Sequence, residues 1–168
     1  MTSISVAALP NPLSSRSQNH ADVHELERGT ITLAARAGDD LFADPSTDGL
    51  VMSASVFAFQ TTGDFQFGAK VKVDFQEKFD SGVLIGYFND QSRFKICAEV
   101  DPAGRARVVT VVKRDRSDDA KSTYLVGDDI QLRISRMGRT FALHSSNDGG
   151  RPASWNVSAA HNENSRSG

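Results

Sequence analysis

The stretch from Phe65 to Gln76 alternates strictly between apolar residues and polar or glycine residues, and this pattern constrains the fold more than any other feature of the sequence. The apolar positions are Phe65, Phe67, Ala69, Val71, Val73 and Phe75. Successive side chains on a strand point to opposite faces, whereas helical spacing would scatter these residues around the helix axis. The stretch therefore predicts a β-strand with one face in a core.

Short strand patterns separated by turn residues make up most of the remaining chain. Further strands are expected at residues 30–34, 52–59, 83–88, 94–100, 107–113, 130–135 and 140–144. The run 83–88 is continuously apolar, which predicts a strand covered on both faces. Turns are expected at 101–104, 137–139 and 147–150, where Gly, Asp, Asn or Pro occur. Short strands with such turns and almost no helical pattern predict an all-β sandwich or barrel.

The length of 168 residues suits one domain with flexible ends. We expect a flexible N-terminal arm at residues 1–28, because this segment is rich in Ser, Pro and Asn, with room for one or two helical turns at 20–28. The β-sandwich domain is expected at 29–158. The polar residues 159–168 predict a disordered tail.

Charge and cysteine content narrow the class of protein. The net charge of −2 predicts no general attraction to nucleic acid or to an anionic membrane. The single cysteine, Cys97, excludes an intrachain disulfide. The N-terminal apolar run Val6–Leu9 is too short for a signal peptide or a membrane span, so we expect a cytoplasmic protein.

Several blocks of residues, in a fixed order, are similar to a known family. They are Asp39–Leu41, Gly63–Phe65, Phe94–Glu99, Val108–Val112, Arg116–Asp119, Leu132–Arg136 and Phe141–Gly149. Together they resemble the widespread family of unknown function that includes the fungal "regulation of enolase" proteins, over roughly Gly29 to Trp155. The resemblance implies a concanavalin A-like jelly roll of two antiparallel sheets. The fungal namesakes are linked to control of glycolytic enzymes, and relatives by fold bind or cleave glycans.

The chain departs from this family at two places. Phe42 stands where the family usually has Trp. The family also continues beyond the position of Trp155 with further strands, whereas here a polar end follows. The jelly roll is therefore expected to lack its last one or two strands.

A polar sheet face is the first candidate site. Lys95 and Glu99 point away from the apolar set of their strand, as Arg133 and His144 do on theirs. If neighbouring strands align, all four share one face, which is concave in a jelly roll and able to bind a sugar. The alternative is a solvated sheet face with ordinary cross-strand ion pairs.

The segment 114–119 is the second candidate, read as a loop at the rim of that face. Ser117 and Asp118 favour loops because their side chains bond nearby backbone groups. A weak calcium site is an alternative, although calcium needs six to eight oxygens. Trp155 is expected either to stack on a sugar ring or to lie in the core.

Catalytic patterns are incomplete. Glu99-Val100-Asp101 begins like the Glu-x-Asp-x-x-Glu motif of fold-related glucanases, but Gly104 replaces the last Glu and Pro102 turns the chain. Cys97 has Lys95 on the same face, which would lower its pKa, but no catalytic His pattern surrounds it. We therefore expect no enzyme, no catalytic residue, no metal and no cofactor.

The leading expectation is a non-catalytic binding module for a carbohydrate or sugar-like small molecule. The residues expected to bind it are Lys95, Glu99, Ser117, Asp118, Arg133, His144 and Trp155. One alternative is a protein-interaction regulator of a metabolic enzyme, which would present an exposed apolar patch to a protein partner. The other is a glycan-active hydrolase. Both a monomer and a homodimer remain open.

Overall fold

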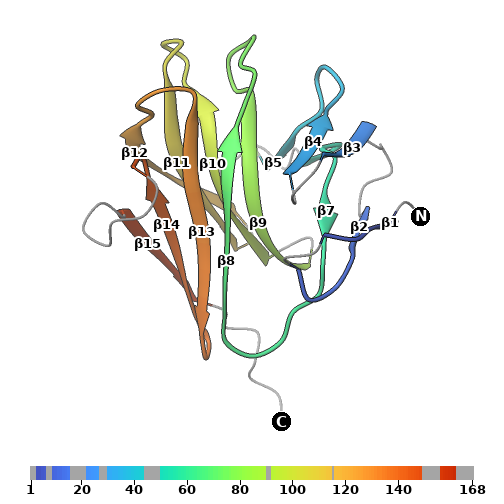
Figure 1. Ribbon diagram of the computed structural model, residues 1–168. Coiled ribbons are helices and arrows are strands. Elements are labelled where there is room, and N and C mark those ends of the chain that lie inside the picture. Colours follow the sequence, from blue (N-terminus) through green and yellow to red (C-terminus); the bar gives the residue numbers. More distant parts are fainter. Residues whose placement is uncertain are drawn as a thin grey trace. The chain divides into compact units, whose positions relative to one another are not determined.

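The computed structural model describes residues 3–6, 9–15, 22–26, 30–43, 50–89, 92–114, 116–148 and 156–161. The chain divides into two compact units, Met1–Thr62 and Gly63–Gly168. All regular elements in the described ranges are β-strands, and every strand pairing is antiparallel (Figure 1). The all-β prediction is therefore confirmed for the described ranges. Within them no helix is long and apolar enough to span a membrane.

The first unit consists of short strands in three small sheets. Its strands are β1 (Ser3–Ile4), β2 (Leu13–Ser15), β3 (Asp22–Leu26), β4 (Thr30–Ala34), β5 (Leu41–Ala43), β6 (Leu50–Met52) and β7 (Phe57–Ala58). They pair in the order β1-β2-β7, with β3 on β4 and β5 on β6. The segment 1–28, expected as a flexible arm, contains β1, β2 and β3. Instead of the helical turns expected at 20–28, residues 22–26 form β3. Its backbone pairs with β4, so that Asp22 lies opposite Ala34 and Leu26 lies opposite Thr30.

The second unit contains two four-stranded sheets. Its strands are β8 (Phe65–Lys72), β9 (Ser81–Asn89), β10 (Ser92–Val100), β11 (Ala106–Arg114), β12 (Arg116–Tyr124), β13 (Asp129–Met137), β14 (Thr140–Ser146) and β15 (Asn156–His161). We call the sheet of order β12-β11-β10-β9 the β10 sheet, and the sheet of order β15-β14-β13-β8 the β13 sheet. The connections β8–β9, β10–β11 and β12–β13 lie at the same end of this unit (Figure 1).

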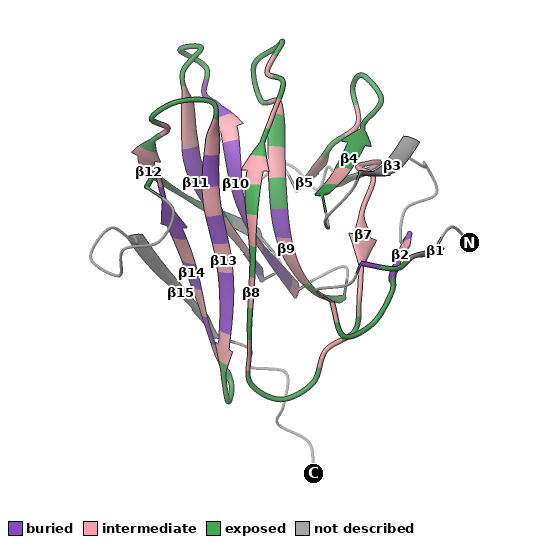
Figure 2. Cartoon of the chain, in the orientation of Figure 1, coloured by how far each residue is buried: buried purple, intermediate pink, exposed green. Residues whose placement is uncertain are grey.

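The core lies between the inner faces of these two sheets. Its buried members are Leu84, Phe94, Ile96, Ala98, Val108, Ile130, Leu132, Ile134, Phe141 and Leu143. Buried segments run along β10, β11, β13 and β14, whereas the loops at both ends are exposed (Figure 2). The ring centroids of Phe94 and Phe141 are 5.0 Å apart, which joins β10 to β14 across the sandwich. The second unit is thus a β-sandwich, built on the alternation that the sequence predicts.

Strand β9 differs from its prediction. It lies at one edge of the β10 sheet, and Val83 and Tyr87 are 39% and 41% exposed. The expectation that 83–88 is covered on both faces is therefore wrong for these two side chains. An apolar run does not distinguish a central strand from an edge strand, because the residues of the run do not specify which strands pair with it.

A strand follows Trp155 in the sequence. This strand, β15, pairs with β14, so that Asn156 lies opposite Ser145 and His161 lies opposite Thr140. This strand includes residues 159–161 of the segment for which the sequence predicts a disordered tail. The polar composition of this segment hid the strand, because an edge strand needs only one side of backbone pairing.

Candidate functional site

The four charged residues expected on one face lie on two opposite faces of the sandwich. Lys95 and Glu99 alternate with core residues of β10, so they lie on the outward face of the β10 sheet. Arg133 and His144 lie on the outward face of the β13 sheet, where they are direct cross-strand neighbours. The expectation of a shared face is therefore wrong. Alternation shows which residues point outward on each strand, but not to which sheet the strand belongs.

The predicted rim loop is part of a strand. β11 ends at Arg114 and β12 begins at Arg116, so Ser117 and Asp118 lie within β12. Asp118 is exposed and pairs with Val112, whose side chain packs against the core. Asp118 therefore lies on the other side of the β10 sheet from Lys95. Trp155 lies outside the described residues.

The alternative of a calcium site at this segment finds no support in the strand geometry. Asp118 and Asp119 are successive strand residues and point to opposite sides of β12. Among the described residues no group of three or more His, Cys, Asp or Glu is placed to hold a metal ion.

One row of side chains crosses the outward face of the β10 sheet. Glu99 pairs with Ser81 on one side and with Arg107 on the other, and Arg107 pairs with Tyr124. Tyr124 and Lys121 are three residues apart and would point to opposite faces of a regular strand. A register shift in the pairing between Arg107 and Val109 places both on the same face. Neighbouring strands are about 4.8 Å apart, so these side chains are within reach of one another. We call this set the Glu99 row.

Arg107 is held at several points. Its Nη2 donates to the carbonyl of Ser122 at 2.8 Å, and its Nη1 lies 3.4 Å from the Tyr124 hydroxyl and 3.8 Å from Asp101 Oδ2. Its guanidinium carbon lies 4.7 Å from the centroid of the Tyr124 ring, within the range of a cation–π interaction. Arg105 approaches the same ring at 4.3 Å and donates to the Tyr124 hydroxyl. Tyr124 thus fixes two guanidinium groups at one end of the face.

Asp101 stabilises the adjacent β10–β11 turn. Its Oδ1 accepts the backbone N–H groups of Ala103 at 2.9 Å and of Arg105 at 3.0 Å. These hydrogen bonds, led by the one from Arg105, hold the pKa of the Asp101 carboxyl below its ordinary value. The Asp101 carboxylate is therefore fixed at the turn, with its Oδ2 3.8 Å from Arg107 Nη1.

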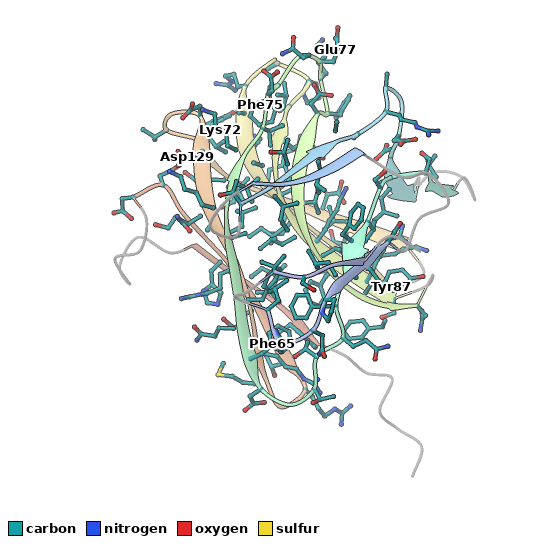
Figure 3. The ribbon with its side chains drawn as sticks, turned by 45° about the vertical axis from the view of Figure 1, so that its right-hand side comes forward. Phe65, Lys72, Phe75, Glu77, Tyr87 and Asp129 are labelled. Atoms are coloured by element: carbon teal, nitrogen blue, oxygen red, sulfur yellow. The ribbon has the colours of Figure 1, made fainter. Side chains whose placement is uncertain are left out.

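Other side chains of the same face are buried. Cys97, in the middle of β10, is fully buried, and Arg93 and Lys113, which pair across β10 and β11 at the end away from the Glu99 row, are 6% and 3% exposed. Burial raises the pKa of the Cys97 thiol to about 12, although Lys95 acts in the opposite direction. The expected effect of Lys95 exists, but burial outweighs it, and the thiol is protonated at neutral pH. Tyr87 lies at the end of β9 far from the β8–β9 connection that carries Glu77 (Figure 3).

The Arg133–His144 pair on the β13 sheet has a different environment. Burial lowers the pKa of the His144 imidazole, and the Arg133 guanidinium lowers it further. Ser135, two residues from Arg133, is 5% exposed. On the same outward face Lys70 forms an ion pair of 2.8 Å with Asp129, and Lys72 pairs with Asp128 (labelled Lys72 and Asp129 in Figure 3). This face is a set of cross-strand polar contacts.

Sequence reasoning missed Arg107 and Tyr124. The turn at 101–104 offers a signal for Arg107, because a hairpin closed by this turn places Glu99 opposite Arg107. No such signal exists for Tyr124. Its position depends on the register shift in the pairing of β11 with β12.

Comparisons with known proteins show the family and the fold of the chain. No curated protein matches the sequence significantly. A crystal structure of a functionally unknown protein from Saccharomyces cerevisiae is similar, with a TM-score of 0.75 and 18% sequence identity, covering 89% of this chain and 78% of that chain. At this identity the likeness shows the fold alone. Residues 18–166 match the family described as "Protein of unknown function (DUF1349)", and the chain therefore belongs to this family.

Proposed function

We propose that the protein is a non-catalytic binding module that takes a carbohydrate or sugar-like ligand on the outward face of the β10 sheet. The observation that carries the proposal is the Glu99 row, in which a carboxylate and a guanidinium lie side by side on adjacent strands. A sugar presents neighbouring hydroxyl groups that both donate and accept hydrogen bonds. Glu99 supplies acceptors, and Arg107 supplies donors only, so the pair matches such a ligand.

The surroundings of the row favour binding over catalysis. Arg107 and Arg105 are fixed against Tyr124, so little side-chain entropy is lost when a ligand binds. Lys95 lies on the same face, four residues from Glu99 along β10. The assignment of the sandwich to the concanavalin A-like lectins and glucanases belongs to this proposal. It is supported by the two packed antiparallel sheets and by the similarity of the sequence blocks described above.

A glycan array tests the proposal directly. Folded protein is expected to bind at least one neutral or acidic glycan, and Lys95→Ala and Glu99→Gln are expected to weaken this binding by about tenfold or more, the effect of losing one charged hydrogen bond. Lys70→Ala is the matched control, because Lys70 is exposed on the outward face of the other sheet. The proposal fails if cooperatively melting protein binds no glycan, or if the three variants behave alike.

A second function, a protein-interaction regulator of a metabolic enzyme, is favoured by an exposed aromatic side chain that a protein partner could cover. Phe79 is 61% exposed, and its φ of 71° is a backbone conformation that a bulky residue rarely adopts. The Asp80 carboxylate accepts the backbone N–H groups of Gln76 and Glu77 at 2.8 Å each, which holds this loop in shape. Val126, 74% exposed, lies in the β12–β13 connection at the same end.

Purified glycolytic enzymes, enolase among them, provide the test of this second function. The protein would change the activity of one of them at a defined stoichiometry, and Phe79→Ser would abolish the change. An effect that persists in Phe79→Ser, or no effect on any enzyme, would exclude this surface as the regulatory contact.

A further inference from the structure

The β10 sheet ends in a strand that has a single pairing partner among the described residues. This strand, β12, pairs with β11, and no described strand pairs with its other side (Figure 1). It is nine residues long and contains no proline. An edge strand of this kind presents a row of backbone N–H and C=O groups that can pair with a further strand.

The side chains in the middle of β12 are exposed on both sides of the strand. Asp118, Asp119, Ala120 and Lys121 are all exposed. Asp119 and Lys121 lie on the outward face of the β10 sheet, and Ala120 between them lies on the other face. Two opposite charges thus flank a small residue in the centre of the edge.

A second copy of the chain can pair with this edge in antiparallel register about a twofold axis at Ala120. In a twofold contact, a residue that meets a second residue of the other copy is met by it in return. The axis at Ala120 therefore places Asp119 of each copy opposite Lys121 of the other, which creates two ion pairs on the same face. Asp118 of each copy lies opposite Ser122 of the other, so no like charges meet.

The neighbouring registers are unfavourable. An axis at Asp119 places two carboxylates opposite each other, and an axis at Lys121 places two ammonium groups opposite each other. An axis between two residues is excluded by the pleat, because opposite residues would then point to different faces. The charges of β12 thus oppose uncontrolled pairing of the edge but favour one symmetric register.

We infer that two copies of the chain associate through β12, in antiparallel register about Ala120, and join their β10 sheets into one continuous sheet. The partner is a second copy of this chain because the edge is complementary in charge to itself. The pairing of two edge strands is small compared with a standard protein interface, so the dimer is expected to be weak and reversible.

Sedimentation equilibrium of the full chain tests the inference. The weight-average mass is expected to rise from 18.2 kDa toward twice this value as the protein concentration rises from about 5 to 500 µM. Raising the NaCl concentration from about 50 to 500 mM is expected to weaken the association, because salt screens exposed ion pairs. A mass that stays at 18.2 kDa throughout overturns the inference.

Charge-reversal variants test the register. Asp119→Lys and Lys121→Asp each create two like-charge pairs, so each variant is expected to associate about tenfold or more weakly than the parent protein. Mixing the two variants restores opposite charges at both positions and is expected to give a heterodimer. The double variant, with both substitutions, is expected to dimerise like the parent protein.

Arg139→Asp is the matched control. It makes the same change in charge as Lys121→Asp, but in the exposed turn between β13 and β14 of the other sheet, and it should leave the association unchanged. Single variants that dimerise as strongly as the parent protein overturn the inference, as does a mixture that forms no heterodimer. If one single variant does not fold, the other single variant and the double variant decide the question.

Discussion

Asp101 and Arg107 are charged side chains whose contacts hold the backbone at one end of the β10 sheet. Asp101 accepts two N–H groups of the β10–β11 turn, and Arg107 donates to the carbonyl of Ser122 in β12. These contacts fix the positions of both side chains, and the hydrogen bonds that Asp101 accepts hold the pKa of its carboxyl below the ordinary value. At the scale of single residues, reactivity therefore depends on burial and on partners more than on residue type.

Cys97 is expected to be unreactive in the folded protein. Burial raises the pKa of its thiol to about 12, and the thiolate is the reactive form. Iodoacetamide at pH 8 should label the native protein at least tenfold more slowly than protein unfolded in guanidinium. Mass spectrometry of timed samples measures both rates. Full labelling of the native protein at the rate of the unfolded chain would contradict the buried, protonated thiol.

His144 is expected to make stability depend on pH below neutrality. Its pKa is lowered in the folded state, so the unfolded chain binds the proton more readily. The contribution of His144 to stability is therefore fully present above its ordinary pKa of about 6.5 and is lost as the pH falls through the lowered value. Urea unfolding from pH 7.5 to 5 should show stability falling, with a slope smaller than that of one whole proton.

His144→Gln isolates this contribution, because the variant cannot bind the proton. The slope of unfolding free energy against pH should be shallower in the variant than in the parent protein. Identical slopes in the two proteins would assign the dependence to other groups.

At the scale of elements, the close approach of β9 to β10 depends on a glycine. Gly86 pairs with Phe94, and a Cβ at position 86 would collide with the Phe94 ring. The absence of a side chain at Gly86 allows that ring to pack against Phe141 of the other sheet. A residue without a side chain in β9 thus determines how an aromatic ring of β10 joins the two sheets.

Gly86→Ala is expected to destabilise the fold by about 1–3 kcal/mol, the usual range for overpacking a core. Phe94→Leu provides the matched background, because a smaller side chain removes most of the collision. The additional cost of Gly86→Ala should be smaller in Phe94→Leu than in the parent protein, as measured by a double-mutant cycle of urea unfolding. Additive effects would show that the Phe94 ring is not the obstacle.

At the scale of the whole molecule, the second unit is held together by a core that both sheets share. Ile130 and Leu132 have no exposed surface, and they face Phe94, Ile96 and Ala98 in one cluster. Burial of apolar surface between two sheets is the main stabilising contribution in such a sandwich. A cavity in this cluster therefore removes packing contacts from both sheets.

Leu132→Ala is expected to lower the unfolding free energy by about 2–5 kcal/mol, because it leaves a cavity in the fully buried centre. Val126→Ala, at a position 74% exposed, should change it by less than about 0.5 kcal/mol. Chemical denaturation of the three proteins measures the differences. Similar stabilities for the two variants would mean that the cluster is not the core of the folded protein.

Part of the candidate site was predictable from the sequence and part was not. The outward direction of Lys95 and Glu99 follows from the alternation of β10, and the turn at 101–104 places Arg107 beside Glu99. Their separation from Arg133 and His144 was not predictable. Strands β10 and β13 belong to different sheets, and no local pattern records which strands share a sheet.

The sequence by itself determined the all-β class, the β8, β10 and β13 strands and the inward face of β8, because a period of two is a local property of consecutive side chains. Only the tertiary structure decided that β9 is an edge strand, that β15 extends the β13 sheet and that Tyr124 lies beside Arg107. Each of these depends on which distant segments pair and in what register. Backbone hydrogen bonds between strands are common to all residues, so side-chain sequence specifies them only through the packing of the complete sandwich.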